Sequence, residues 1–445
     1  MALRHPIQHP ARLVPLAFLV AITVGTILLL MPIARAGPGG APLLIALFTA
    51  TSAICVTGLA VVDIPTYWSG FGQAVILALF QVGGFGIMSG ATLLALLVTR
   101  RLGLSTRLIA QAETRSVALG DVVAVLRLVL VVTIGVETLL AAILIPYLRF
   151  AYHEPWGQAI WHGVFHAVSA FNNAGLSTYP DSLVRFAADP LILVPIMVAV
   201  ILGGLGIPVL YELRQKPNQP ARWSVHTKLT LLGTAILLFG GFVVVLAFEW
   251  KNPTTLGPHA PASKLLGSMF YSAMTRSGGF NAFDTGQMRP ETLAASYALM
   301  MIGGGSAGTA GGIRVTTFLL LGFVVLAEVR GESDTTVFRR RIPAEVQRQA
   351  LTIVLLAVGS VAAGTLILLS VTDFALDDIL FETISAFATV GLTTGITRDL
   401  PPVGQFVVTV LMYMGRVGTT TLATALALRS KQRPYRYPEE RPIVG

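Results

Sequence analysis

The chain has 445 residues, of which 54% are hydrophobic and only 12% are charged, and its formal net charge is +9. This composition excludes the soluble globular classes and is typical of an integral membrane protein. The positive charge therefore does not indicate a nucleic-acid partner. The single cysteine, Cys55, excludes an intramolecular disulfide.

Apolar stretches long enough to cross the hydrocarbon core of a bilayer, which takes about 20 residues, recur along the chain. The predicted spans are residues 13–34, 71–98, 122–148, 189–213, 229–250, 292–327, 350–371 and 403–428. The first of them is too long and begins too late for a cleaved signal peptide.

A short pattern recurs four times, each time between two predicted spans. Its copies are FTATSAICVTGL (48–59), FHAVSAFNNAGL (165–176), MFYSAMTRSGGF (269–280) and FETISAFATVGL (381–392). We therefore predict an all-α integral membrane protein in which four span–pore-loop–span repeats surround one pseudo-fourfold pore. The predicted repeats cover residues 11–98, 122–213, 228–327 and 350–428, the third with a broken second span, and residues 429–445 form a cytoplasmic C-terminal tail.

Each copy of the pattern predicts a short helix followed by a loop with a glycine. The segment 48–54 is about two helical turns, and the partially negative end of such a helix stabilises a cation at the membrane centre. Irregular backbone at this depth is tolerated where it lines a water-filled path, and carbonyl oxygens can replace the water around a small cation. Four amphipathic surface helices are the alternative. The predicted potassium-binding residues are Val56, Thr57, Gly58, Asn173, Ala174, Gly175, Ser277, Gly278, Gly279, Thr389, Val390 and Gly391.

A glycine-rich segment at 303–312 interrupts the sixth predicted span. Six of its ten residues are glycine, and at about 1 kcal/mol per glycine it cannot hold a stable helix. We predict a flexible gate below the filter, with close helix packing through small residues as the alternative. The segment also matches G-x-G-x-x-G, but no strand precedes it, which excludes a dinucleotide site. The predicted gate is Gly303, Gly304, Gly305, Ser306, Ala307, Gly308, Thr309, Ala310, Gly311 and Gly312, with Arg416.

Two arginines in apolar surroundings are candidates for function, because a buried charge in a membrane is costly. Arg416 is predicted to donate hydrogen bonds to carbonyls of the glycine-rich segment and to oppose cation passage when the gate is closed; pairing with an acid is the alternative. Arg276 is predicted to brace the third loop, with Glu382 as its partner. His162 and His166 have the spacing of a metal pair, but packing is favoured.

The basic residues predict the orientation. If the N-terminus is cytoplasmic, the inner segments 1–12, 99–121, 214–228, 328–348 and 429–445 hold 2, 4, 4, 5 and 5 of the 31 Lys and Arg residues. The positive-inside rule then places both termini in the cytoplasm and the four loops at the outer face. Acidic residues, among them Asp63, Asp181 and Asp284, gather on the outer side, where they would concentrate cations.

The chain resembles the superfamily of potassium transporters that includes the Trk, Ktr and plant HKT proteins. The residues that carry the resemblance are the four glycine loops, the segment 303–317 and residues 414–418. The resemblance covers essentially the whole chain. With eight predicted spans and no extra N-terminal pair, the chain looks like the membrane subunit of a bacterial Ktr system. The resemblance implies potassium uptake across the bacterial cytoplasmic membrane by a homodimer with one pore per chain. It also implies a cytoplasmic, nucleotide-binding regulatory ring of the RCK type.

The resemblance also bears on selectivity. Plant HKT proteins often carry a serine in place of the first filter glycine, which goes with sodium preference, so Gly58 favours potassium. No cofactor is expected in this chain; potassium is the substrate and sodium a candidate activator. A sodium-conducting or weakly selective transporter is the main alternative. A carrier for organic solutes would need inverted repeats. A membrane-embedded enzyme would need clusters of His, Asp, Glu or Cys within the spans, where few are present, so no enzyme is expected.

Overall fold

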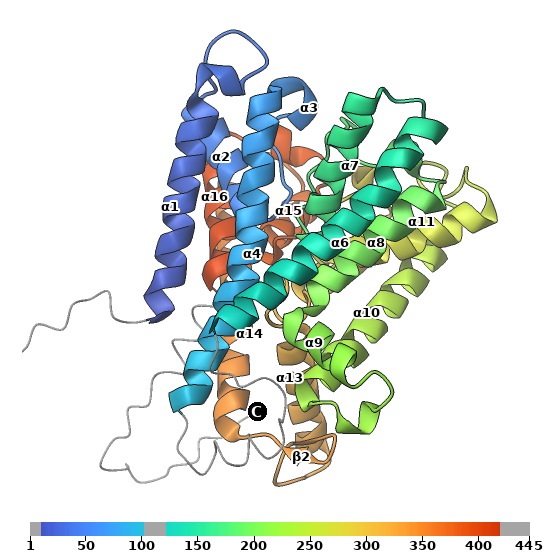
Figure 1. Cartoon of the computed structure of the whole chain (residues 1–445). Helices are drawn as coiled ribbons and strands as arrows, with labels where there is room; N and C mark the ends of the chain where they lie inside the picture. Colours follow the sequence, from blue (N-terminus) through green and yellow to red (C-terminus); the bar gives the residue numbers. More distant parts are fainter. Residues whose placement is uncertain (1–9, 102–121, 419–445) are drawn as a thin grey trace, which may run out of the picture.

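The computed structural model describes residues 10–101 and 122–418, and almost all of their regular structure is helical (Figure 1). In these ranges, three helices are long and apolar enough to cross a membrane: α6 (Val122–Ala151), α10 (Val225–Glu249) and α14 (Ala344–Val371). A bent pair of helices, α8 and α9, forms a fourth candidate span. The predicted all-α membrane fold is confirmed.

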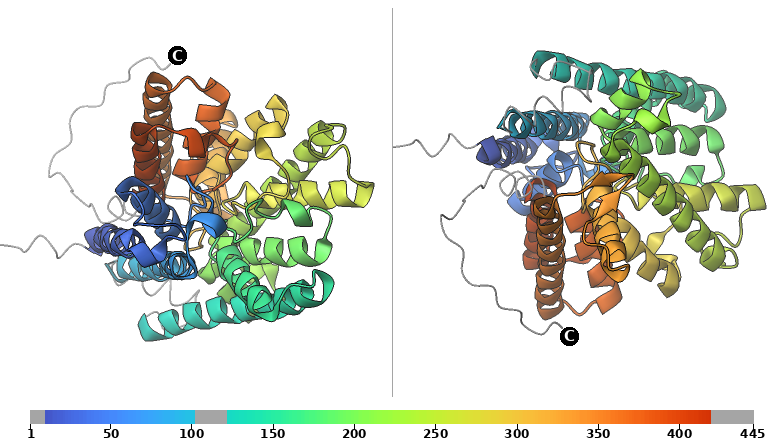
Figure 2. Two further views of the ribbon diagram at one scale, coloured as in Figure 1. Left: turned by 90° about the horizontal axis from the view of Figure 1, so that it is seen from above. Right: turned by 90° about the horizontal axis from the view of Figure 1, so that it is seen from below.

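The same order of elements recurs four times: a long helix, a short helix, a loop and a second long segment. The first group is α1 (Pro10–Leu30), α2 (Leu43–Ile54), the single turn α3 (Ile64–Tyr67) and α4 (Gly70–Arg101). The second is α6, α7 (Trp156–Phe171), α8 (Pro190–Leu205) and α9 (Ile207–Gln215). The third is α10, α11 (Pro261–Met274), α12 (Pro290–Met301) and α13 (Val315–Val329). The fourth is α14, α15 (Leu376–Ala388), α16 (Pro402–Tyr413) and a π-helical turn, Met414–Gly418. Seen from above, the groups occupy four sectors around one centre (Figure 2).

The four short helices, α2, α7, α11 and α15, form the inner layer and are called the pore helices below. Prolines start three of them: Pro42 and Pro155 directly precede α2 and α7, and Pro261 is the first residue of α11. The first pore helix is therefore longer than the segment 48–54 predicted from the sequence. Each copy of the pattern contributes a phenylalanine with no exposed surface: Phe48, Phe165, Phe270 and Phe381.

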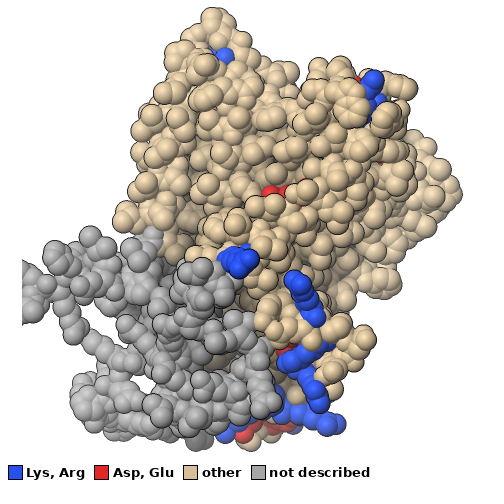
Figure 3. Space-filling view, in the orientation of Figure 1, with Lys and Arg blue, Asp and Glu red and all other residues tan. Residues whose placement is uncertain are grey.

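The outer helices expose large apolar side chains, as expected of a surface that faces lipid. Leu19 on α1, Phe239 on α10 and Leu355 on α14 are 48%, 65% and 62% exposed. In the view of Figure 3, a broad belt almost free of charged residues separates a few charges at the upper end from a larger group of Lys and Arg at the lower end. The belt is the part of the surface that a bilayer would cover.

Two of the predicted spans are interrupted. The segment 189–213, predicted as one span, is not one continuous helix: α8 ends at Leu205, and α9 leaves it at an angle of 97°. Gly206 makes the bend with a φ of +91°, and Pro208 follows in the first turn of α9. In the segment 292–327, α12 ends at Met301 and α13 begins at Val315.

A short hairpin joins the third and fourth groups at the lower end. Its strands are β1 (Thr336–Val337) and β2 (Arg340–Arg341), and the two residues of the turn, Phe338 and Arg339, both have positive φ. Short 3₁₀ turns lie at Pro32–Ala34, Val184–Phe186, Pro220–Arg222, Thr285–Gln287 and Ile396–Asp399. Residues 419–428 of the last predicted span and the predicted tail at 429–445 lie outside the described residues.

Candidate ion filter and gate

The chain turns back after each pore helix through a loop with one shared backbone shape. We call these the filter loops, residues 56–59, 173–176, 277–280 and 389–392. In each loop the first residue and the glycine two positions later both have positive φ. The φ values are 54° and 97° for Val56 and Gly58, 60° and 65° for Asn173 and Gly175, 71° and 72° for Ser277 and Gly279, and 49° and 92° for Thr389 and Gly391. Positive φ is rare for β-branched residues such as Val56 and Thr389, so the surrounding structure must enforce it.

The four filter glycines meet around one point. A Cβ atom built on any of them would lie within 3.0 Å of a carbonyl oxygen of another loop, so no side chain fits there. These contacts close a ring: Gly58 faces the oxygen of Ala174, Gly175 that of Gly278, Gly279 that of Val390, and Gly391 that of Thr57. Four equivalent carbonyl groups, each from the residue before a filter glycine, therefore surround the same centre. Such a ring of oxygen dipoles can coordinate a cation without any charged side chain.

Serines at the ends of three pore helices hold the filter loops in place. Ser52 accepts a hydrogen bond from the amide of Gly58 (3.2 Å), and Ser169 donates to the oxygen of Leu176 (2.8 Å). Ser385 does both, accepting from the amide of Gly391 (3.2 Å) and donating to the oxygen of Leu392 (2.6 Å). In the third repeat the same position is occupied by Ala273, which cannot form such a bond.

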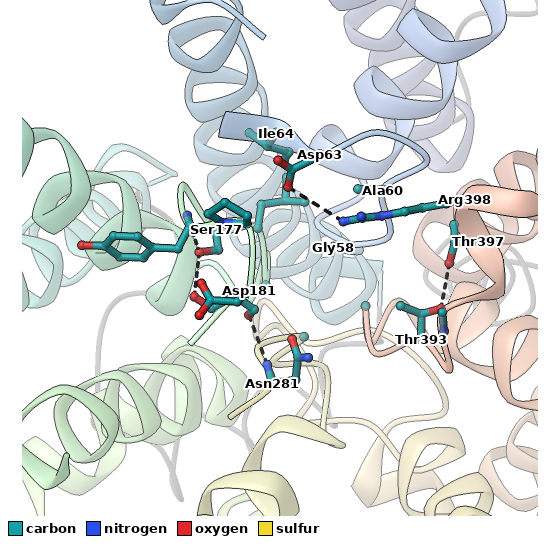
Figure 4. Close-up of a pocket in the computed structure, with 18 of the residues that line it drawn as sticks. Gly58, Ala60, Asp63, Ile64, Ser177, Asp181, Asn281, Thr393, Thr397 and Arg398 are labelled. Carbon is teal, nitrogen blue, oxygen red and sulfur yellow. Dashed lines mark hydrogen bonds and ion pairs between the residues drawn. The ribbon is translucent and has the colours of Figure 1, made fainter. Parts of the chain in front are cut away.

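A vestibule of about 460 Å³ opens above the filter glycines (Figure 4). Its lining includes the carboxylates of Asp63, Asp181 and Asp284 and the guanidinium of Arg398. Arg398 and Asp63, from the fourth and first repeats, form an ion pair with an N–O distance of 3.8 Å across the mouth. The excess of acidic over basic side chains gives the vestibule a field that attracts cations.

The glycine-rich residues 303–312, called the gate segment below, lie between α12 and α13. Hydrogen bonds join the two ends of this segment. The amide of Gly303 donates to the oxygen of Ile313 (2.8 Å), and the amide of Ile313 donates to the oxygen of Met301 (3.1 Å). The segment therefore forms a loop whose two ends are fixed to each other.

The bend in the second repeat provides acceptors for the gate segment. A helix leaves its last four carbonyls without partners inside the helix. At the end of α8, the oxygen of Gly204 accepts from the amide of Gly305 (2.8 Å), and the oxygen of Gly203 accepts from the amide of Thr309 (3.0 Å). The break in one repeat thus satisfies the irregular backbone of another.

Two arginines, one fully and one partly buried, also hold the gate segment. Arg416, which is 1% exposed, donates from Nη1 to the carbonyl oxygen of Thr309. Arg314 donates from Nη1 to the oxygens of Gly305 (3.2 Å) and Ala310. Within the described parts of the chain Arg416 has no carboxylate partner, so pairing with an acid is not supported. The two guanidinium groups place positive charge beneath the filter.

The predicted pairing of Arg276 with Glu382 is wrong. The side chain of Arg276 reaches the hydroxyl of Thr234 on α10 (3.2 Å) and the oxygen of Gly303 (3.4 Å), so it braces the gate segment as well as its own repeat. Glu382 accepts hydrogen bonds from Thr393 (2.8 Å) and Thr397 instead. Arg276 is directed from the end of its pore helix toward α10 and α12, whereas Glu382 faces the loop that follows the fourth filter glycine.

A polar cluster behind the second filter loop was not predicted. Asn172 donates to Glu137 on α6 (2.9 Å) and to Gln81 on α4 (2.7 Å), and Gln81 donates to Glu137 (3.1 Å). The cluster ties the end of the second pore helix to helices of two repeats. An acid in the middle of an apolar span, Glu137, was the available signal.

The paired histidines of the second pore helix pack against Tyr179. The ring centroids of His162 and His166 lie 4.5 and 5.2 Å from that of Tyr179. His162 shares a hydrogen bond with Thr178 (2.6 Å), and His166 with Ser177 (2.9 Å). The histidines thus hold the residues that follow the second filter loop.

Comparison with known proteins identifies the family to which this chain belongs. The family model of the TrkH cation transport protein matches residues 17–435. The Ktr system potassium uptake protein B of Bacillus subtilis is 37% identical, covering 98% of this chain and 97% of that protein. The Ktr system potassium uptake protein B of Vibrio alginolyticus is 34% identical, covering 98% and 94%. The potassium/sodium uptake protein NtpJ of Enterococcus hirae is 32% identical, covering 98% and 97%.

Among solved structures, the potassium transporter TrkH from Vibrio parahaemolyticus matches with a TM-score of 0.72, covering 97% of this chain and 87% of that one. At 16% identity this likeness shows the fold. The sequence relatives show more, because they match nearly end to end at more than 30% identity. The chain therefore belongs to the TrkH family of cation transport proteins, beside the Ktr-type membrane proteins, and is a transporter, not an enzyme.

Proposed function

We propose that the chain is the translocating subunit of a Ktr-type system that takes up potassium across the bacterial cytoplasmic membrane. The observation that carries this proposal is the closed ring of four carbonyl groups, those of Thr57, Ala174, Gly278 and Val390. A dehydrated potassium ion would exchange water oxygens for these carbonyl oxygens. The names of the Bacillus and Vibrio relatives support potassium as the substrate.

The proposed path runs from the vestibule through the filter to the gate segment. The carboxylates of Asp63, Asp181 and Asp284 would raise the local cation concentration at its entrance. Arginines 339–341 are exposed at the opposite end of the molecule, which by the positive-inside rule faces the cytoplasm. Both termini are then cytoplasmic, and the ion moves inward down its electrochemical gradient.

The gate segment and Arg416 form the proposed gate. In the described conformation the segment lies beneath the filter and its carbonyls are occupied by Arg416 and Arg314. A desolvated guanidinium close to the path opposes the passage of another cation, since little water screens the two charges. Opening requires the segment to leave Arg416, so the bonds between them set the resting leak.

Control of this gate is proposed to come from separate subunits. We expect a homodimer of this chain, and a cytoplasmic ring of RCK-type subunits that bind nucleotide and dock on the basic face. The exposed arginines of the β1–β2 hairpin offer positive charge to such a partner. Sodium remains a candidate activator.

Growth of a potassium-uptake-deficient bacterium on limiting potassium tests the substrate, with and without a co-expressed Ktr-type regulator. Wild type should restore growth, and Gly58→Ser should not, because a side chain there meets the oxygen of Ala174. The matched control is Gly240→Ser on α10, where a Cβ meets no atom within 4 Å. Absence of rescue under every condition, with verified membrane expression, would overturn potassium uptake.

A sodium-conducting or weakly selective transporter is the second candidate. Each filter loop offers one glycine with positive φ and one carbonyl of the ring, so few carbonyl layers act on the ion. The Enterococcus hirae relative is named for both potassium and sodium. Flux of each cation into liposomes containing the purified chain decides between the candidates: equal fluxes favour this one, and a strong preference for potassium excludes it.

A further inference from the structure

The gate segment is hydrogen-bonded to the filter loops themselves. The hydroxyl of Ser277, the first residue of the third filter loop, donates to the oxygen of Thr389 in the fourth loop (2.6 Å). The same hydroxyl accepts from the amide of Gly311 in the gate segment (3.1 Å). Ser277 is fully buried, so water does not compete for these bonds. One side chain therefore joins two filter loops and the gate.

A second connection reaches the second filter loop. Thr309 in the gate segment donates from its hydroxyl to the side-chain oxygen of Asn173 (2.8 Å). The backbone oxygen of Thr309 is the acceptor used by Arg416. A single residue of the gate segment is thus bonded both to the filter and to the arginine beneath it.

The contacts fall on equivalent residues. Asn173, Ser277 and Thr389 each occupy the first position of their filter loops, where φ is positive and the backbone is strained. The approach is close: a Cβ on Gly311 would collide with the Thr389 side chain and lie 2.7 Å from the oxygen of Ala388. In the first loop this position is Val56, which has no polar group in its side chain. The gate segment therefore supports the strained position of three loops.

Spare polar atoms lie at the same boundary. The side-chain nitrogen of Asn173 and the hydroxyl of Thr389 are buried and have no hydrogen-bond partner among the described residues. A buried polar group without a partner is destabilising. These atoms are available to new hydrogen-bond partners if the gate segment shifts.

We propose that Ser277 couples the cation in the filter to the position of the gate segment. A potassium ion holds the carbonyl ring in one geometry and thereby preserves the bonds from Ser277 to Thr389 and Gly311; a smaller cation leaves the ring distorted and weakens them. Coupling of this kind is reciprocal, so movement of the gate segment also changes cation preference. The inference rests on the proposed function, since it requires cations to occupy the ring.

The position of the gate segment can be followed by chemical labelling. Ser306→Cys places a thiol on the partly exposed part of the segment, whereas native Cys55 is fully buried. The probe is a hydrophilic thiosulfonate reagent, applied to the purified full-length chain in potassium or in sodium buffer. The chain without Ser306→Cys reports any labelling of Cys55. We expect the labelling rates in the two buffers to differ by at least about fivefold.

Variants in the Ser306→Cys background separate coupling from simple structural support. Ser277→Ala should abolish the difference between potassium and sodium, and Ser277→Thr should retain it, since threonine keeps the hydroxyl and occupies this position in the fourth loop. Ser268→Ala is the matched control: it removes a fully buried hydroxyl of the same repeat that bonds to the oxygen of Lys264 in its own helix (2.8 Å). This variant should keep the difference. If Ser277→Ala does not fold, Thr309→Val removes the connection to Asn173 and should reduce the difference.

Equal labelling in both buffers would overturn the coupling, and so would a full difference in Ser277→Ala or, if that variant does not fold, in Thr309→Val. Potassium and sodium fluxes through the same preparation, reconstituted in liposomes, test the proposed function separately. Flux that prefers potassium together with equal labelling refutes the coupling alone. Absence of cation flux, also with a co-reconstituted Ktr-type regulator, refutes the proposed function and the coupling with it.

Discussion

The filter loops and the gate segment are both irregular, glycine-containing backbone inside the membrane, but they are held in different ways. The filter loops depend largely on their own pore helices, through serines such as Ser52 and Ser385 six residues before the glycine. The gate segment depends on partners distant in the sequence, including Gly203 and Arg416. Local bonds make a rigid element, whereas bonds to other repeats break when the repeats or the segment move. The filter loops are thus fixed mainly from within their own repeats, and the gate segment mainly from other repeats.

The largest effect should come from a filter glycine. Gly175→Ala places a methyl group within 3.0 Å of backbone atoms of Gly278 and Gly279, at a φ of +65° that alanine disfavours. We expect loss of nearly all potassium uptake and of discrimination against sodium, measured by flux in liposomes. Gly359→Ala on α14, where a Cβ meets nothing within 4 Å, should behave as wild type. Normal selective flux in Gly175→Ala would contradict a rigid carbonyl ring.

Arg416→Ala tests whether a partner distant in the sequence holds the gate segment. Removing the guanidinium frees the oxygen of Thr309 and removes a positive charge beneath the filter. We expect the leak without a regulator to rise about tenfold, as for the loss of about 1.4 kcal/mol from a barrier. Arg416→Lys should leak less than Arg416→Ala. An unchanged leak at normal expression would remove Arg416 from the gate.

Gly206→Ala is expected to act on the gate from the second repeat. The substitution strains the bend between α8 and α9, and the new methyl group would lie 2.6 Å from the oxygen of Ser306. We expect a leak increased severalfold and a loss of about 1–3 kcal/mol in stability from the strained backbone. Thermal unfolding in detergent and liposome flux measure the two effects. An unchanged leak in a destabilised variant would show that the bend supports the fold but does not act on the gate.

The cluster behind the second filter loop should have a moderate effect on the filter. Glu137→Ala leaves the side-chain donors of Asn172 and Gln81 without their acceptor, which costs about 1–3 kcal/mol. We expect lower thermal stability and a modest loss of potassium preference, both smaller in Glu137→Gln, which keeps an acceptor oxygen. Equal effects of the two variants would show that charge, not hydrogen bonding, matters there.

The smallest effect is expected in the vestibule. Asp63→Asn removes one carboxylate that is partly exposed and already paired with Arg398 at 3.8 Å. We expect the apparent potassium affinity to fall about twofold at low ionic strength, because exposed charges contribute little. At about 0.15 M added salt with an inert cation the difference should disappear, since the Debye length falls to about 8 Å. A difference that persists at high salt would indicate direct ion binding.

The features that could be predicted from the sequence are those with a local signal, and the features that were missed depend on contacts between distant residues. The repeats, the fold class and the family were readable because apolar length and recurring glycines are local signals. The positive φ of Val56 and Thr389 was not, because β-branched residues disfavour this conformation and only tertiary contacts enforce it. Gly206 and Pro208 are residue types that indicate a helix break, but they lie within a long apolar run that favoured one continuous span. The partners of Arg276 depend on how α10 and α12 pack, which no local pattern encodes.

Ala273 illustrates a consequence of having four repeats in one polypeptide: the repeats can differ from one another in sequence. In a channel made of four identical chains, every change in one loop is made in all of them. Here the third repeat has Ala273 where the other three have a serine, and Ser277 and Arg276 of this repeat bond to the gate segment instead. A single polypeptide therefore allows one quadrant to be held differently while all four still contribute a carbonyl group to the ring.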